Sequence, residues 1–328
     1  MTIPAALLFQ THFFDRGAAR AFARLRAAAP AHYHPCVLIH LPPGAALPRR
    51  LAGVPHHVVR TPELQVPAYP TKCGGAGWDL WNGGHTDLIA LHFIRAHPKF
   101  GRYWLVEYDV RFSGDWRRFL GAFEDEPADF VAPLIRRRED QPDWMWWPTL
   151  RIPAEAPDGP TLCAFLPIWR ASRAAVLAVD AAWRAGWGGH SEAVWPTAVA
   201  RAGLSLLDPG GDGAFTPPAL RGRFYSSTMA DLHLAPGTLV WKPPLLRPGT
   251  RPDMLWHPVK PFWPRAELRN AVRELRVDLG AARRALLSRR AGRGGGALRL
   301  LEGGGPLVGA GAAGPAAAAR RRAEPPGP

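Results

Sequence analysis

The sequence lacks any apolar run of the roughly eighteen residues that a membrane-spanning helix needs. Its start, MTIPAALLFQTHFFDR, lacks the basic segment of a signal peptide, and the short apolar run there is followed by His12 and Asp15. It has only three cysteines, Cys36, Cys73 and Cys163, without the short spacings of zinc knuckles or disulfide frameworks. We therefore expect no transmembrane segment, no signal peptide, reduced cysteines and a cytoplasmic location.

The sequence also lacks a nucleic-acid recognition motif, although its net charge is +14. About half of that charge lies after Gly280 in an Arg-, Ala-, Gly- and Pro-rich tail, and this residue usage is typical of a GC-rich genome. No basic face is interleaved with stacking aromatic residues, so we expect no specific nucleic-acid partner. An anionic substrate, or peripheral association with an anionic membrane, remains compatible with the charge.

Strand and helix patterns alternate over the first part of the chain. Short apolar runs at 5–10, 35–41 and 56–60 predict buried strands, and a helical pattern at 18–29 separates the first two. Strand, helix and strand at this spacing indicate right-handed βαβ crossovers. We therefore predict an α/β fold with an open, mostly parallel twisted sheet flanked by helices.

Later segments define the predicted domain organisation. Residues 166–183 are predicted to form one helix, with Ser172 capping near its start. One α/β domain is assigned to 1–265, and an amphipathic, Arg-rich helix to 266–290. The remainder, 291–328, is rich in Gly, Ala, Pro and Arg and poor in large apolar residues, so we predict a disordered tail.

The stretch from Tyr103 to Trp116, YWLVEYDVRFSGDW, places two acids where an apolar run ends. Glu107 and Asp109 are two residues apart, so in a strand they lie on one face. Open α/β sheets bind ligands beyond the carboxyl ends of their strands, where carboxylates and substrate phosphates together suit Mg²⁺ or Mn²⁺. The pair therefore indicates a metal–diphosphate site. The alternative is a solvated turn or a helix cap.

Two other segments carry groups suited to a diphosphate. Lys72 precedes a Gly-rich turn whose amides, near Gly74 and Gly75, could receive phosphate oxygens. In a Pro-rich loop, His257 could complete a metal site and Lys260 could offset phosphate charge. The alternatives are a solvated lysine and a structural histidine.

A Gly-rich helix start carries a titratable pair. Gly188 and Gly189 are followed by His190 and Glu192, and a pair at such a place suits a general base or an acceptor-binding group. The alternative is that Ser191 or Glu192 merely caps the helix.

Aromatic residues cluster in the segment WMWWPTL, which holds Trp144, Trp146 and Trp147. Indole rings in a loop can pack against the C–H faces of sugars. The alternative is that they anchor the core.

Together, these features resemble a GT-A-type glycosyltransferase, and more narrowly a bacterial and fungal branch marked by a WxxExDVRxxGxW segment. That segment comprises Trp104, Glu107, Asp109, Val110, Arg111, Gly114 and Trp116. Other segments similar to the branch are Trp81 and Asn82 with Thr86 and Asp87, Gly189 to Glu192 with Trp195 to Thr197, and His257 to Lys260. The resemblance covers roughly residues 3–265.

The resemblance implies a metal-dependent glycosyltransferase that moves a sugar from a nucleotide-diphosphate donor to a hydroxyl acceptor on a glycan, lipid or small molecule. Asp109, Glu107 directly or through water, and His257 would hold Mn²⁺ or Mg²⁺. Glu107 departs from the usual Asp-x-Asp pattern. The residues expected to contact the donor are Lys72, Asn82, Asp87 and Lys260.

The stereochemistry of transfer decides whether a base is needed. Inversion needs a group that accepts the proton of the acceptor hydroxyl, and we predict Glu192, with His190 or Asp115 as alternatives. Retention needs no such base. The alternative function is a non-catalytic carbohydrate- or nucleotide-binding protein on the same scaffold, with Trp146 and Trp147 as sugar platforms. The sequence does not specify the oligomeric state.

Overall fold

The computed structural model describes residues 3–74, 78–81, 83–226, 237–240 and 245–260. The chain divides into two units, Met1–Asp278 and Leu279–Pro328, and all of the described residues belong to the first. The predicted helix at 266–290 and the predicted tail at 291–328 lie outside the described residues and stay predictions. In the described part of the chain, no helix is both long and apolar enough to cross a membrane.

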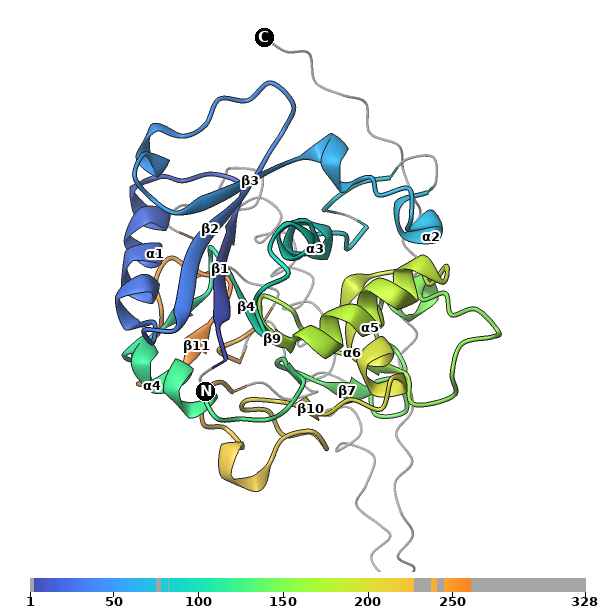
Figure 1. Cartoon of the computed structure of the whole chain (residues 1–328). Coiled ribbons are helices and arrows are strands. Elements are labelled where there is room, and N and C mark those ends of the chain that lie inside the picture. The colour runs from blue at the N-terminus through green and yellow to red at the C-terminus, as the bar shows by residue number, and fades with distance from the viewer. Residues whose placement is uncertain (1–2, 75–77, 82, 227–236, 241–244, 261–328) are drawn as a thin grey trace, which may run out of the picture. The chain divides into compact units, whose positions relative to one another are not determined.

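A seven-stranded sheet with the order β10-β6-β9-β4-β1-β2-β3 lies between helices (Figure 1). Strands β4, β1, β2 and β3 are parallel to one another, as are β10 and β6, whereas β9 runs antiparallel to both of its neighbours. The predicted α/β class, with an open and mostly parallel sheet, is confirmed. The strands are β1 (Ala5–Thr11), β2 (Tyr33–Leu41), β3 (His56–Arg60), β4 (Arg102–Glu107), β6 (Phe130–Val131), β9 (Ile168–Ser172) and β10 (Leu206–Leu207).

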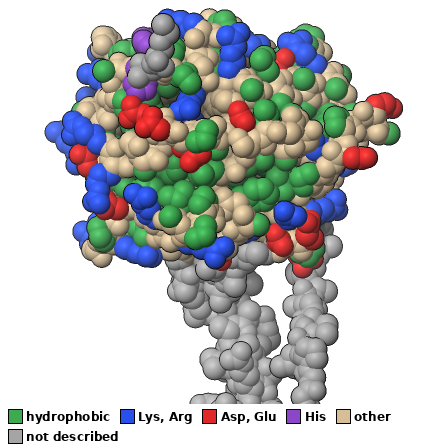
Figure 2. Space-filling model, turned by 60° about the horizontal axis from the view of Figure 1, so that its bottom comes forward, with side chains coloured by type: hydrophobic (Ala, Val, Ile, Leu, Met, Phe, Trp, Pro, Cys, Tyr) green, Lys and Arg blue, Asp and Glu red, His purple; other side chains and the backbone are tan. Residues whose placement is uncertain are grey.

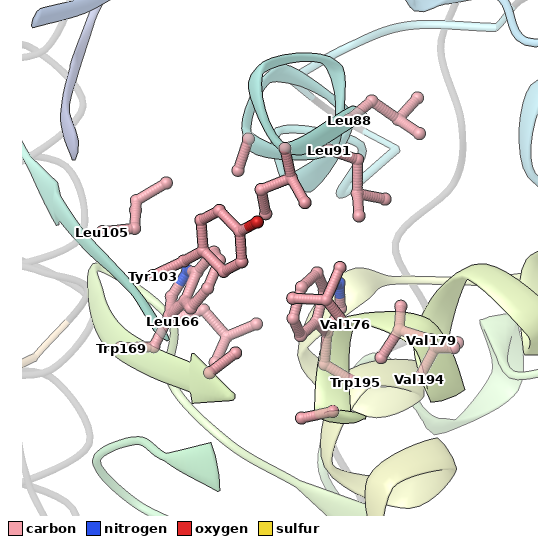
Figure 3. Close-up of a cluster of buried hydrophobic side chains, with 14 of the residues drawn as sticks. Leu88, Leu91, Tyr103, Leu105, Leu166, Trp169, Val176, Val179, Val194 and Trp195 are labelled. Carbon is pink, nitrogen blue, oxygen red and sulfur yellow. The ribbon is translucent and has the colours of Figure 1, made fainter. Parts of the chain in front are cut away.

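Helices bury both faces of this sheet, which explains why its central strands are continuously apolar. Along β1, Leu7 and Phe9 face the cluster under α1 and α4, while Ala6 and Leu8 face the cluster under α3, α5 and α6. Figure 3 shows part of the second cluster, in which side chains of β4 and β9 meet those of the three helices. The helices are α1 (Arg16–Ala28), α2 (Pro70–Cys73), α3 (Asp87–Ala96), α4 (Trp116–Ala122), α5 (Arg173–Arg184) and α6 (Ser191–Arg201).

Short elements complete the described part of the chain. Two small antiparallel pairs accompany the main sheet, one between β5 and β11 and the other between β7 and β8. Their bounds are β5 (Arg111–Phe112), β7 (Arg136–Arg137), β8 (Leu162–Cys163) and β11 (Leu255–Trp256). Single 3₁₀ turns occur at Arg49–Leu51, Thr61–Leu64, Trp147–Thr149 and Pro218–Leu220.

The prediction of one helix over 166–183 is wrong in its first part. Strand β9 occupies the beginning of that segment and lies between β4 and β6. Ile168 faces the cluster under α1 and Trp169 the opposite cluster, so pairing within a doubly covered sheet overrides the helical pattern. Ser172 caps α5 as expected, because its Oγ accepts a hydrogen bond from Ala175 N at 3.1 Å.

Candidate active site

The acidic pair lies at the carboxyl end of β4, but only its first member belongs to the strand. Glu107 ends β4, whereas Asp109 lies in a tight turn that Val110 N closes by donating to Glu107 O at 3.0 Å. Tyr108 N donates to Gln10 O at 2.9 Å and ties this turn to the neighbouring strand. The expectation that strand alternation aligns the two carboxylates is therefore wrong, because the turn aligns them instead.

Strand β11 brings a histidine from a distant part of the sequence to this turn. Leu255 pairs with Phe112, and further along Val259 N donates to Asp109 O at 2.7 Å. His257 lies between these two contacts. Pairing of the β11 segment with the chain after β4 thus places the imidazole beside both acids.

Glu107, Asp109 and His257 form a compact group, called here the Glu-Asp-His triad, whose candidate ligand atoms all lie within 4.8 Å of one another. His257 Nε2 is 3.5 Å from Asp109 Oδ1 and 3.7 Å from Glu107 Oε2. His257 Nδ1 lies 2.7 Å from the carbonyl oxygen of Val240, which can only accept, so Nδ1 carries the proton. The lone pair of Nε2 is thereby turned toward the two carboxylates.

The electrostatics of the triad suit a cation. Burial raises the pKa of Glu107 well above its usual value, and the charges of Asp109 and Glu192 raise it further. Burial lowers the pKa of His257, although the charge of Asp109 opposes this, so the imidazole is neutral. Asp109 Oδ1 is buried without a hydrogen-bond partner. Two carboxylates and one imidazole nitrogen are ligands that Mn²⁺ or Mg²⁺ accepts, with positions left for water or phosphate oxygens. The residues therefore fit such an ion.

A second titratable pair lies at the start of α6. His190, rather than Ser191 or Glu192, caps the helix, because its Nδ1 accepts from Glu192 N at 3.3 Å. Burial raises the pKa of Glu192 to about 7 and lowers that of His190 to about 3. Glu192 Oε1 accepts from Leu166 N at 3.2 Å, which fixes the carboxyl group. At neutral pH, the pair offers one neutral imidazole and one carboxyl that exchanges protons readily.

The loop at 164–167 contacts both this pair and the triad. Leu166 N binds Glu192, while the Phe165 ring packs edge-on to His257 with centroids 5.2 Å apart. Pro167 O accepts from Glu107 N at 2.8 Å. The charge of Glu192 also raises the pKa of Glu107.

Lys72 and Asp87 are brought together, but they are paired with each other. Their ion pair of 3.1 Å is buried, with side-chain exposures of 0% and 3%. Lys72 Nζ also donates to the carbonyls of Gly84 at 2.9 Å and Gly189 at 3.3 Å, and Asp87 Oδ2 accepts from Trp195 Nε1 at 2.9 Å. Both side chains therefore stabilise the surrounding fold. Lys72 holds the backbone carbonyls of Gly84 and Gly189, which lie beside His190, and Asp87 holds the Trp195 indole.

The other predicted site residues differ in their distance from the triad. Lys260 directly follows Val259, whose backbone N donates to Asp109 O at 2.7 Å, so Lys260 lies near the triad. Asp115 is half-exposed and caps α4 by accepting from Arg117 N at 3.0 Å, in a groove that no triad residue lines. The structure does not bring Asp115 to the triad. Asn82 lies outside the described residues.

The two tryptophans proposed as sugar platforms differ in exposure. Trp147 is 4% exposed, and its Nε1 donates to Gln141 O at 2.7 Å. It belongs to the core, so its prediction as a platform is wrong. Trp146 is half-buried and stacks on the His190 ring, with centroids 4.5 Å apart and planes inclined by 13°.

The sequence analysis missed a cluster of rings beyond the ends of β1 and β2. The His12 ring lies 5.2 Å from that of Tyr108 and 5.3 Å from that of Trp81, which is 50% exposed, and His40 lies 5.8 Å from Trp81. Tyr108 lies between Glu107 and Asp109 in the chain, so the cluster adjoins the triad. Burial lowers the pKa of His12, and the charge of Asp109 opposes this. The available signal was that His12 and Tyr108 directly follow the apolar strands β1 and β4.

No protein-family model matches the chain, and no curated protein matches it. Among solved structures, it is distantly similar to the inositol-1-phosphate CTP transferase of T. maritima, with 11% identity over 63% of this chain and 86% of that chain at a TM-score of 0.33. It is also similar to mouse xyloside xylosyltransferase 1 in its apo form, with 10% identity over 65% of this chain and 88% of that chain at a TM-score of 0.34. HddC of Yersinia pseudotuberculosis has 8% identity over 53% of this chain and 78% of that chain at a TM-score of 0.26. TM-scores this low carry no argument about function.

Proposed function

We propose that the chain is a metal-dependent glycosyltransferase that moves a sugar from a nucleotide-diphosphate donor to a hydroxyl acceptor. The observation that carries this proposal is the Glu-Asp-His triad, in which the buried Asp109 Oδ1 has no hydrogen-bond partner and faces the lone pair of His257 Nε2. An uncompensated buried carboxylate oxygen costs free energy unless a proton or a cation joins it. The triad lies at the carboxyl end of β4, where open α/β sheets bind ligands.

The triad residues would hold Mn²⁺ or Mg²⁺. When bound there, the ion would act as a Lewis acid toward the diphosphate leaving group. Val240 O keeps the His257 ring in the orientation that points Nε2 at the acids. Lys260 lies close enough for its charge to act on Glu107, and it would add positive charge for the diphosphate.

The ring cluster supports a nucleotide on the same side of the sheet. His12, Tyr108 and the half-exposed Trp81 adjoin the triad and present aromatic edges and faces. Such surfaces bind the flat faces of a base or a ribose. The neutral state of His12 leaves one ring nitrogen able to donate and the other able to accept a hydrogen bond.

Glu192 is the proposed base for transfer with inversion. The acceptor oxygen forms a bond to sugar C1 as the bond from C1 to the diphosphate oxygen breaks, and Glu192 takes the acceptor proton. A pKa of about 7 suits this role, because the carboxylate then exists at neutral pH and still holds a proton well. Leu166 N fixes Oε1. Oε2 lies 3.6 Å from His190 Nδ1, which already accepts from Glu192 N, so Oε2 would take the acceptor proton. The stacked pair of Trp146 and His190 would form the adjoining wall for a sugar acceptor.

The alternative function is a carbohydrate-binding protein without catalysis. The half-exposed Trp146 stacked on His190 favours it, because such a ring can pack on a sugar whether or not chemistry follows. In that case, glycan binding is independent of metal, and sugar nucleotides are not hydrolysed.

The test is a thermal-shift screen of sugar nucleotides with and without Mn²⁺, followed by a hydrolysis assay with any donor that binds. A ligand at 100 times its dissociation constant adds about 2.7 kcal/mol to the free energy of unfolding. We expect a metal-dependent shift and slow hydrolysis in the wild type, and neither in Asp109→Asn. Asp115→Asn is the matched control, because asparagine still caps α4. Metal-independent glycan binding with no donor shift would favour the alternative.

A further inference from the structure

A groove of about 710 Å³ lies along α1, bordered by the start of α4 and by the loop at Leu246. One face of α1 forms its wall, and small residues on that face, Gly17, Ala21 and Ala28, leave it open. Leu246 is 63% exposed at its rim. The volume lies within the range of about 300–1,000 Å³ that is usual for small-molecule sites.

Arginine side chains dominate the charge of this groove. Figure 2 shows Lys and Arg side chains along the left side of the molecule, the side on which Figure 1 places α1 and α4. The arginines that line the groove are Arg20, Arg24, Arg111, Arg117 and Arg247. The acidic lining residue, Asp115, is already engaged, because it accepts from the backbone N and from Nη1 of Arg117 at 3.0 and 3.3 Å.

Four of these arginines form no ion pair with an acid within the described ranges. The ion pairs found there leave out Arg20, Arg24, Arg111 and Arg247. Arg20 and Arg24 are exposed and lie four residues apart, on one side of α1. Their guanidinium groups are thus free to bind an anion that enters the groove.

Like charges also converge at the inner end of the groove. Arg24 on α1 and Arg111 on β5 both line the groove, so two guanidinium groups border the same cavity. Arg111 donates through Nη1 to the carbonyl of Val110 at 2.8 Å, so its position is fixed by the turn it holds. Converging guanidinium groups repel one another unless an anion lies between them, and their planar forks match phosphate oxygens.

We propose that this groove is a second binding site, separate from the Glu-Asp-His triad, that takes a phosphate monoester or diphosphate group. No residue of the triad lines the groove, and no acid with a free carboxylate lines it, so it is built for anions without a metal. The bound group comes from a soluble phosphate compound or from a phospholipid headgroup. Both present the same oxygens to Arg20, Arg24 and Arg247.

The experiment measures binding to the full chain in the presence of EDTA, which removes the metal that the triad would need. The probes are inorganic pyrophosphate, by titration calorimetry, and vesicles of equal parts phosphatidylcholine and phosphatidic acid, by cosedimentation. The variant is Arg20→Gln with Arg24→Gln. Its matched control is Arg49→Gln with Arg50→Gln, which removes the same charge from an exposed pair that does not line the groove.

We expect the groove variant to bind about tenfold or more weakly than the wild type, while the control pair and Asp109→Asn bind as the wild type does. Selective loss of pyrophosphate binding identifies a soluble phosphate. If the wild type binds vesicles but not pyrophosphate, and the groove variant loses vesicle binding, the ligand is a phospholipid headgroup. All variants keep the Arg-rich tail, so the difference between the two double variants is decisive.

Equal weakening in both double variants, or no binding by the wild type in either assay, would overturn the proposal. Arg247→Gln, in a loop outside α1, is the second variant and should also weaken binding. It keeps the test valid if the α1 variant melts below the wild type.

Discussion

His257 Nε2 lies 3.5 Å from Asp109 Oδ1, and hydrogen bonding of the ring to Val240 O leaves only a lone pair on the side that faces the acid. Two acceptors thus face each other in a buried place. The turn after β4 and the loop after β11 create this contact together, since Val259 N also binds Asp109 O. Such an arrangement is stable when something positive lies between the two atoms.

The first prediction concerns Asp109→Asn. Without metal, this variant should melt at or above the wild-type temperature, because it removes a buried carboxylate that lies beside Glu107. With Mn²⁺, the wild type should gain stability and the variant should not. Thermal melts in EDTA and in Mn²⁺ measure both effects, and His257→Gln should abolish the same gain. A gain of equal size in all three proteins would show that the ion binds elsewhere.

The second prediction concerns the pH dependence set by Glu192. Its pKa is about 7 in the folded chain against 4.5 ordinarily, so the folded state binds the proton more tightly. Between these values, rising pH therefore lowers the free energy of unfolding, and above about 7 the loss is complete. Glu192→Gln removes this effect and should be more stable than the wild type by about 2 kcal/mol at pH 8. Urea denaturation at several pH values measures the free energy of unfolding of both proteins. The same dependence on pH in the wild type and in Glu192→Gln would contradict the prediction.

Activity should rise with pH, whereas the free energy of unfolding should fall. Transfer needs the Glu192 carboxylate as base, so kcat should rise with pH and level off above about 7. Glu192→Gln should lower kcat on the order of 10²- to 10⁴-fold with little change in the KM of the donor. A variant that keeps kcat but raises the acceptor KM would assign Glu192 to binding.

The third prediction concerns the buried pair of Lys72 and Asp87. Lys72→Met leaves a buried carboxylate without its cation and should cost about 3–5 kcal/mol. Adding Asp87→Asn removes that charge and keeps an acceptor for Trp195 Nε1, so the double variant should recover at least about 1 kcal/mol. A double-mutant cycle by chemical denaturation measures the coupling. Additive losses would mean that the pair contributes little.

The fourth prediction compares two glycines with similar backbone angles. Gly84 has φ of +66° and a Cβ added there would meet the His190 ring at 2.0 Å, whereas Gly222 has φ of +64° and open space. Alanine strains the backbone at both positions by about 1–2 kcal/mol. Only Gly84→Ala should also displace His190 and lower the transfer rate. Equal loss of rate at both positions would remove His190 from the site.

The sequence by itself determined the fold class, the first three strands and the helix between the first two. Continuous apolar runs became β1, β2 and β3, and α1 formed close to its predicted bounds, because burial on both faces leaves few other solutions. The acidic residues at the end of β4 followed from the same reading, since an apolar run that ends in carboxylates marks a strand's exit. Where the helical pattern and the pairing of β9 disagreed, sheet burial prevailed.

The tertiary structure alone decided which of these polar residues meet. His257 reaches the acids because β11 pairs with β5, and Lys72 is engaged because the fold places Asp87 3.1 Å from its buried ammonium. The pKa of Glu192 is raised by burial within the folded chain, and Trp147 is buried in the core whereas Trp146 is half-exposed. Spacing along the chain carries no information about such contacts, because distances between side chains far apart in sequence are set by packing and strand pairing.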